Sequence, residues 1–134
     1  MNFAISHFRY FMVSLFRYFF CILRQNSFSM IDREKIEEIV LKIKQGYDPD
    51  KIILFGSYAN GIPDEHSDLD LLIIKNSQKT RPERGIEVRR LLSGALIPMD
   101  ILVYTDQEIK ESSNNRYSFI YHALKSGKTL YERQ

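Results

Sequence analysis

The stretch that decides the fold is KIILFGSYANG, residues 51–61, followed closely by SDLDLLII, residues 67–74. The first part opens with a β-branched and aromatic run of strand length, and Gly56 ends that run. The second part is rich in Leu and Ile once two carboxylates, Asp68 and Asp70, are passed. Together they predict two buried strands joined by a sharp turn and a polar connection.

Outward from this stretch, the remaining chain alternates helical patterns with short apolar runs. Apolar residues recur at helical spacing after Asp32, which is placed to cap a helix that Gly46 ends. Thr105 to Glu108 has the spacing of a capping box, so a helix begins at Asp106. In chain order we predict a helix over 32–45, strands over 51–55 and 68–74, a helix over 81–92, a strand over 99–104, a helix from 106, a helix over 116–126 and a short strand over 129–131. This order predicts an α+β fold, a small mixed or largely antiparallel sheet covered by helices.

Length and composition favour one compact domain, residues 30–134, behind an unusual N-terminal segment. Residues 1–29 contain seven of the nine phenylalanines, and Arg17 interrupts their apolar run, which disfavours a membrane span or a secretory signal. Two interpretations stay open for this extension. It is a start-site artefact with Met30 as the natural first residue, or it is an amphipathic helix that lies on a membrane surface.

The charge of the body argues against general nucleic-acid binding. Residues 1–29 hold three arginines and no acid, so removing them from the 19 basic residues leaves 16 against 17 acidic ones. Proteins that bind nucleic acid usually concentrate positive charge, so we expect no direct nucleic-acid partner. We also expect no membrane partner, because Arg17 interrupts the short apolar run of the N-terminal segment. The only cysteine, Cys21, cannot form an intrachain disulfide, so the cytoplasm is the expected location.

The paired carboxylates predict a metal site. Side chains alternate along a strand, so Asp68 and Asp70 project to one side, where two anions repel unless a cation lies between them. Magnesium suits carboxylate oxygens and bridges readily to phosphate. Gly56 permits the sharp turn, and Ser57 is placed to cap a short helix and to present its hydroxyl to a phosphate. Gly61 then lets the chain leave at positive φ.

Asp100 is a third acid, near the start of an otherwise apolar strand. A carboxylate beside the core is costly unless it is paired or bound to a metal. If this strand lies beside that of Asp70, Asp100 joins the cluster as a ligand and as a general base. Two metal ions roughly 3.5–4 Å apart would then hold an acceptor oxygen, an α-phosphate and a leaving pyrophosphate in line.

The sequences 56–61 (GSYANG), 67–71 (SDLDL) and 99–105 (MDILVYT) resemble the minimal nucleotidyltransferase family of the DNA polymerase β superfamily. The likeness extends from about Met30 to the C-terminus and implies the polymerase β-like nucleotidyltransferase fold. It implies that Asp68, Asp70 and Asp100 bind two magnesium ions and act in catalysis. It also implies that ATP is the nucleotide donor and that Gly56, Ser57, Asn60 and Gly61 contact its phosphates, with Asn60 standing where many relatives carry a basic residue.

Members of this family are commonly encoded beside a small helical HEPN protein. The resemblance implies an antitoxin that transfers AMP from ATP to a tyrosine of the cognate HEPN ribonuclease toxin. Two alternatives stay open: a non-catalytic antitoxin that masks its toxin by binding, and nucleotidyl transfer to a small molecule. A homo-oligomer also stays open.

Two charged features near the motif have simpler interpretations. His66 is expected to be a solvent-exposed loop residue rather than a phosphate ligand. Glu83 and Glu87 are interleaved with four arginines, so the segment is expected to be a solvated helix face. The arginines are Arg81, Arg84, Arg89 and Arg90.

Overall fold

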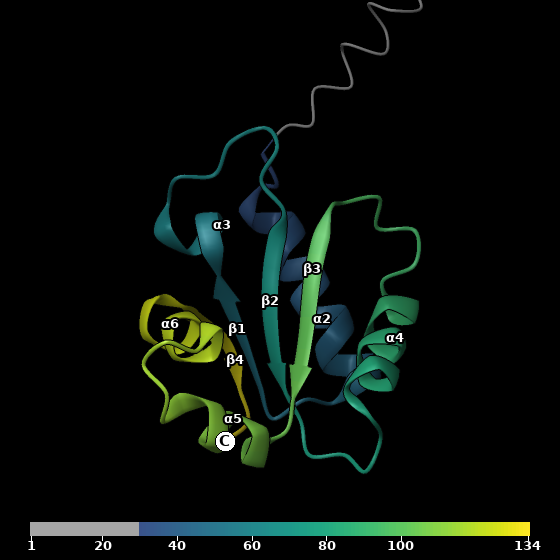
Figure 1. The fold of residues 1–134 in the computed structure, drawn as a ribbon. Coiled ribbons are helices and arrows are strands. Elements are labelled where there is room, and N and C mark those ends of the chain that lie inside the picture. Colours follow the sequence, from purple (N-terminus) through teal and green to yellow (C-terminus); the bar gives the residue numbers. More distant parts are fainter. Residues whose placement is uncertain (1–29) are drawn as a thin grey trace, which may run out of the picture.

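The computed structural model describes residues 30–134, which form a four-stranded sheet between two layers of helices (Figure 1). Both predictions for residues 1–29 fall outside the described residues. The α+β class and the small mixed sheet covered by helices are confirmed. The elements in chain order are α2 (Arg33–Tyr47), β1 (Lys51–Phe55), α3 (Gly56–Asn60), β2 (Leu69–Ile74), α4 (Arg81–Leu91), β3 (Met99–Tyr104), α5 (Asp106–Ser113), α6 (Phe119–Ser126) and β4 (Lys128–Glu132).

The sheet has the strand order β3-β2-β1-β4. β1 pairs antiparallel with both β2 and β4, whereas β2 pairs parallel with β3. A parallel pair needs a crossover connection, and α4 supplies it between β2 and β3. Because the two strands run in the same direction, the polar residues at their N-terminal ends meet at one end of the sheet (Figure 1).

Alternation along the strands divides the core into two layers. On one face of the sheet, odd-numbered residues of β2 and β3, such as Leu71 and Ile101, pack against α2 and α4. On the other face, Leu72 and Ile74 pack against Ile120 and other residues of α6. Each fully buried side chain of this size contributes about 1.5–3 kcal/mol relative to an exposed one, so both helical layers are held by the sheet.

Gly46 does not end the first helix, contrary to the prediction from sequence. α2 continues to Tyr47, and the left-handed residue that terminates it is Asp48, with φ 53°. A Cβ on Gly46 would lie only 2.8 Å from a methyl carbon of Leu91 in α4. The glycine therefore allows α2 and α4 to approach closely, a role that the local sequence does not reveal. The predicted cap, Asp32, is confirmed, because its carboxylate accepts a hydrogen bond from the Lys35 N–H.

The last helix begins later than predicted, at Phe119 instead of Arg116. The Ser118 hydroxyl accepts a hydrogen bond from the Tyr121 N–H at 3.1 Å and so caps the helix, while the Ser118 N–H donates to the Asn115 carbonyl in the preceding turn. The capping box at Thr105 and the helix start at Asp106 are confirmed.

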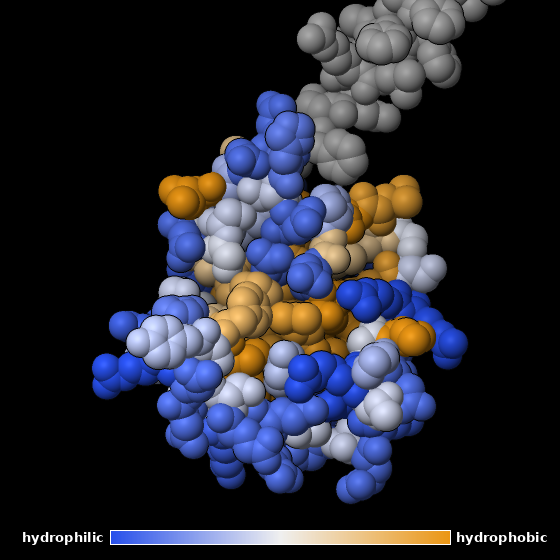
Figure 2. Space-filling model, viewed as in Figure 1, coloured by the Kyte–Doolittle hydropathy of each residue, from blue (hydrophilic) through white to orange (hydrophobic). Residues whose placement is uncertain are grey.

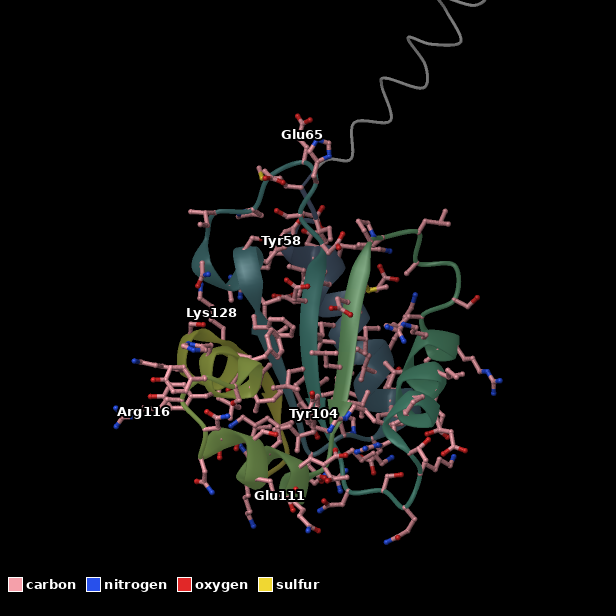
Figure 3. All side chains as sticks on the ribbon, viewed as in Figure 1. Tyr58, Glu65, Tyr104, Glu111, Arg116 and Lys128 are labelled. Atoms are coloured by element: carbon pink, nitrogen blue, oxygen red, sulfur yellow. The ribbon has the colours of Figure 1, made fainter. Side chains whose placement is uncertain are left out.

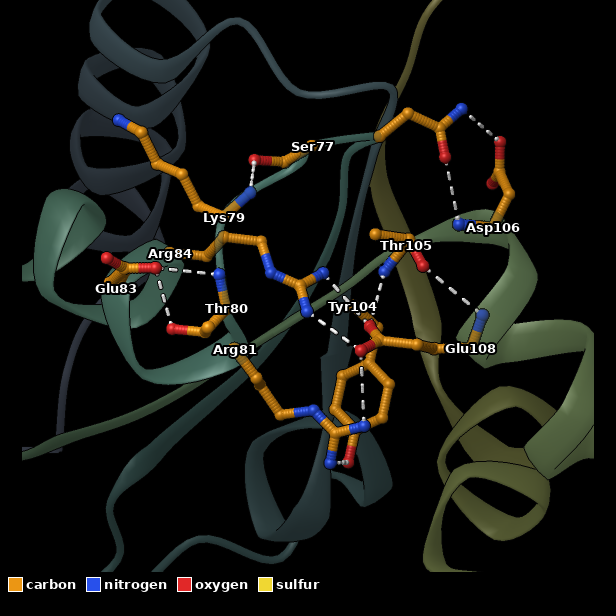
Figure 4. A network of polar contacts seen from close by, with 11 residues as sticks. Ser77, Lys79, Thr80, Arg81, Glu83, Arg84, Tyr104, Thr105, Asp106 and Glu108 are labelled. Carbon is orange, nitrogen blue, oxygen red and sulfur yellow. Dashed lines mark hydrogen bonds and ion pairs between the residues drawn. The ribbon is translucent and has the colours of Figure 1, made fainter.

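The arginine cluster is not uniformly a solvated helix face, so that expectation is wrong for one of its members. Arg84 is only 2% exposed, and its guanidinium donates two hydrogen bonds to the Glu108 carboxylate at 2.9 and 2.8 Å (Figure 4). Arg81, Arg89 and Arg90 are exposed, as expected. The Arg84–Glu108 pair ties α4 to the start of α5 beneath the C-terminal end of β3.

Within residues 30–134, no helix combines the length and the apolar character needed to cross a membrane.

Candidate active site

Two of the three predicted acids lie side by side on neighbouring strands. Asp70 of β2 and Asp100 of β3 are direct partners in the parallel register. Each acid stands two positions before a residue that packs on the α5–α6 side of the sheet, Leu72 for Asp70 and Leu102 for Asp100. Because side chains two positions apart in a strand share a face, both carboxylates project to that side. The sequence analysis required the Asp100 strand to lie beside the Asp70 strand, and the structure meets this condition.

Asp68 lies one residue before β2, which begins at Leu69 instead of at Asp68 as predicted. Asp68 is exposed, as is Asp100, whereas Asp70 is half-buried. Burial raises the pKa of Asp70 above its ordinary value, and the negative charges of Asp100 and Asp68 raise it further. The ionised form of Asp70 is thus disfavoured by its surroundings, which is the electrostatic condition under which a carboxylate gains from a nearby cation.

Gly56 brings the main chain against the Asp70 carboxylate. It has φ +70°, and an added Cβ would lie 2.1 Å from Asp70 Oδ2. Both the backbone conformation and the lack of space therefore require glycine here. The motif glycine and the motif aspartate are consequently in direct contact, although 14 positions separate them along the chain.

The other motif residues lie on the short helix α3, at the same end of the sheet. Ser57 does not cap this helix as predicted; it lies within the first turn, and the capping position is Phe55, which makes no side-chain cap. Gly61 has φ +74° and ends the helix, as predicted, with its N–H donating to the Ser57 carbonyl. Asn60 is exposed at the end of the helix. Figure 3 shows Tyr58 of α3 at this end and Tyr104 at the opposite end.

The donor chemistry of the three acids suits a hard divalent cation, because carboxylate oxygens are the ligands that magnesium prefers. Among residues 30–134, however, no three His, Cys, Asp or Glu side chains are already gathered closely enough to hold a metal ion. Asp68 and Asp100 are exposed, so packing does not fix their rotamers. The assignment of the three acids as ligands and catalytic groups stays a prediction.

Arg89 is a neighbour of the site that the sequence did not indicate. Its Nη2 lies 4.0 Å from Asp100 Oδ1, with both side chains more than half exposed. The only sequence signal is its position on the face of α4 that also carries Arg81 and Gly85, at intervals of four residues. His66 is exposed in the loop before β2, as expected, and its backbone N–H donates a hydrogen bond to the Asp64 carboxylate.

An apolar surface adjoins the acids on the same face of the sheet. Leu102 is half-buried next to the buried Leu72, and the Phe55 ring meets the Phe119 ring edge to face with 5.2 Å between centroids. Phe119 remains 51% exposed. Figure 2 shows this apolar band across the centre of the face, bordered by hydrophilic side chains.

Comparison with known proteins identifies the family. The sequence matches the family described as "Polymerase beta, Nucleotidyltransferase" over residues 34–134. The chain belongs to this nucleotidyltransferase family, which confirms the resemblance found in the sequence and the fold that it implied. A domain of this kind implies a nucleotide donor and, in general, a divalent metal.

Three relatives from Methanocaldococcus jannaschii carry the name "Putative protein adenylyltransferase". MJ0604 is 31% identical over 106 residues, covering 76% of this chain and 100% of its own. MJ1305 is 50% identical over 59 residues, covering 42% of this chain and 38% of its own. MJ0141 is 41% identical over 54 residues, covering 40% of this chain and 54% of its own. The chain thus spans about half or less of the length of the last two relatives.

A solved structure shares the fold. A crystal structure described as a "putative nucleotidyltransferase from Sulfolobus solfataricus" superposes with a TM-score of 0.53 at 20% identity, covering 75% of this chain and 79% of the other.

Proposed function

We propose that this protein is a magnesium-dependent adenylyltransferase that moves AMP from ATP to a tyrosine of a HEPN toxin and so acts as its antitoxin, in the cytoplasm. The observation that carries the proposal is the pairing of Asp70 with Asp100 in register, with the backbone of Gly56 against the Asp70 carboxylate. A protein acceptor is supported by the names of the relatives from M. jannaschii. The HEPN partner, encoded adjacently, rests on the family resemblance.

In the proposed reaction, the acceptor oxygen forms a bond to the α-phosphorus of ATP and the bond to the β-phosphate breaks, releasing pyrophosphate. Asp68, Asp70 and Asp100 would hold magnesium, which would neutralise phosphate charge and orient the reacting groups. Asp100 is exposed at the strand start and accepts the proton that leaves the acceptor hydroxyl. Gly56 lets the main chain that would bind the phosphates approach the Asp70 carboxylate closely, where any side chain would collide with it.

The direct test is label transfer. The full chain is incubated with ATP labelled at the α-phosphate, magnesium and the protein encoded by the neighbouring gene, and labelled protein is detected after electrophoresis. We expect the partner to be labelled, and EDTA to abolish the labelling. Absence of label, with both proteins folded and active nucleotide present, would exclude the proposal.

A matched pair of variants connects the reaction to the site. Asp68→Asn combined with Asp70→Asn removes two proposed ligands and should reduce labelling to background. Asp106→Asn removes a carboxylate at the far end of β3, where Asp106 accepts a hydrogen bond from Asn76, and should label normally. If the double variant folds and still fully protects cells from the toxin, the antitoxin acts by masking and the catalytic mechanism is wrong.

A further inference from the structure

Arg89 stands beyond the acid cluster, on the side away from Gly56. The strand order places β1, which Gly56 follows, on one side of β2, and it places β3 with Asp100 on the other side. α4 lies past β3 (Figure 1), and from there Arg89 reaches Asp100, with 4.0 Å between Nη2 and Oδ1. The order across this end of the sheet is therefore Gly56, Asp70, Asp100 and Arg89.

That order places Arg89 on the acceptor side of the proposed reaction. In an in-line displacement at phosphorus, the attacking oxygen and the leaving oxygen lie on opposite sides of the phosphorus. If the main chain at Gly56 and Ser57 holds the leaving pyrophosphate, the acceptor hydroxyl approaches from the side of Asp100. Arg89 is then positioned to contact the acceptor.

The other end of α4 and β3 shows an arginine that holds a tyrosine. The Arg81 guanidinium carbon lies 4.1 Å from the centroid of the Tyr104 ring, and Nη1 donates a hydrogen bond to the Tyr104 hydroxyl at 3.2 Å. Nη2 of the same guanidinium lies 3.5 Å from the Glu108 carboxylate (Figure 4). One arginine thus binds an aromatic ring, its hydroxyl and a carboxylate together, which its planar cation allows.

Arg89 and Asp100 repeat two parts of this arrangement. Arg89 is eight positions after Arg81 on α4, about 12 Å along a helix, and Asp100 is four positions before Tyr104 on β3, about 13 Å along a strand. Arg89 meets the Asp100 carboxylate through Nη2, as Arg81 meets Glu108. The ring has no counterpart: within residues 30–134, no aromatic side chain lies over the Arg89 guanidinium.

The Arg89 side chain is accessible to such a ring, because it is 55% exposed. Its Nη1 lies 3.4 Å from the position of an added Gly85 Cβ, so the glycine lets the guanidinium lie close to α4. Arg89 and the half-buried Leu102 both line a hollow of about 230 Å³. A planar cation beside an apolar side chain suits an aromatic group with a polar tip.

We propose that Arg89 binds the ring of the acceptor tyrosine, stacking on it as Arg81 stacks on Tyr104, and so presents the tyrosine hydroxyl to Asp100. The inference rests on the proposed function and names the residue that selects tyrosine as the acceptor. Serine and threonine also carry a hydroxyl, but they have no ring and lose this contact. When the tyrosine oxygen bonds to the α-phosphorus, its proton passes to Asp100 and pyrophosphate leaves.

The first test measures the initial rate of label transfer to the protein encoded by the neighbouring gene, with that partner and ATP varied in turn. Arg89→Gln should lower kcat/KM for the partner about tenfold, equivalent to about 1.4 kcal/mol, and should change KM for ATP less than about twofold. Arg89→Lys keeps the charge but lacks the planar guanidinium, so it should lower kcat/KM for the partner about threefold.

The matched control is Arg90→Gln, which removes an exposed charge from the next position of α4. It should change kcat/KM for the partner and KM for ATP less than about twofold, because Arg90 does not face Asp100. Circular dichroism checks that each variant folds.

The second test needs neither ATP nor magnesium. N-acetyltyrosinamide is added to the full chain labelled with a nitrogen isotope, and NMR follows the Nε–H resonances of the arginine side chains. We expect a saturable upfield shift at Arg89, caused by the ring current of the stacked phenol, and no shift with N-acetylserinamide. Arg81, whose guanidinium already stacks on Tyr104, and the exposed Arg90 should shift less than Arg89.

The outcomes separate this inference from the proposed function. Label transfer with equal kcat/KM for the partner in Arg89→Gln and Arg90→Gln refutes the role of Arg89 alone, and so does an equal change in KM for ATP and for the partner. No label transfer by the wild-type chain refutes the proposed function, and the NMR titration then decides whether Arg89 binds a tyrosine side chain. Equal shifts at Arg89 and Arg90, or a shift of Arg89 with N-acetylserinamide, would overturn that binding.

Discussion

The buried ion pair between Arg84 and Glu108 gives a quantitative prediction for the substitution Glu108→Gln. Glu108 accepts two hydrogen bonds from the Arg84 guanidinium and one from the Thr105 N–H (Figure 4). Glutamine keeps the shape and can still accept the Thr105 bond, but it removes the charge. Arg84, 2% exposed, would then be a buried cation without its counter-charge.

The magnitude follows from the acidity of Glu108. Chiefly through the Arg84 hydrogen bonds, the pKa of Glu108 is lowered from 4.5 to about 2. At about 1.4 kcal/mol per unit this corresponds to about 3 kcal/mol of stability. The Glu108 side chain is 27% exposed, and solvent screening reduces the contribution. We therefore expect Glu108→Gln to lower the free energy of unfolding by about 2 kcal/mol at neutral pH.

Urea denaturation followed by circular dichroism measures this change. A lowered pKa means that the stabilisation is present above the ordinary carboxyl pKa of 4.5 and is lost as the pH falls toward about 2. The difference between wild type and variant should therefore shrink over that window. Glu111→Gln, on the exposed side of the same helix, is the matched control and should change stability by less than about 0.5 kcal/mol (Figure 3). Equal stability of Glu108→Gln and wild type at neutral pH, or a difference that persists unchanged in acid, would refute the reasoning.

Three further predictions concern the motif region. Asp70→Asn should raise the thermal unfolding midpoint near neutral pH, because the raised pKa of Asp70 means that the ionised carboxylate destabilises the folded state. The gain should disappear in acid, where the Asp70 carboxyl is protonated in both the folded and the unfolded state. Gly56→Ala should lower the free energy of unfolding, measured by urea denaturation, by about 2 kcal/mol or more, because Gly56 has a positive φ and an added Cβ would collide with Asp70. Gly61→Ala is the control and should lower it by only about 1 kcal/mol, because Gly61 has a similar φ but nothing within 4 Å of an added Cβ. Tyr58→Phe should cost about 1 kcal/mol in the same assay by removing the acceptor of the Ile31 N–H bond, 3.0 Å long; no loss would contradict that contact.

Elements with local signals were predicted closely. The strands at 51–55 and 99–104 have the predicted bounds, and the capping box placed the start of α5 at Asp106. These features depend on side-chain alternation, turn residues and hydrogen bonds between positions three apart. The start of the last helix was wrong because two local signals compete there, since Asn115 and Ser118 could both serve as a cap. The errors at Gly46 and Arg84 have another cause, which is contact with residues distant in the sequence.

The sequence alone determined that Gly56, Asp68 and Asp70 belong to one motif, since their spacing and the strand patterns on each side of the turn are local properties. Only the tertiary structure decided that Asp100 lies beside Asp70, because the register of two strands 30 residues apart is fixed by the packing of α4 across the sheet. The same holds for the pairing of Arg84 with Glu108, 24 residues away. Local propensity does not predict which distant residue will face a given side chain. That pairing is decided when both helical layers are buried against the one sheet.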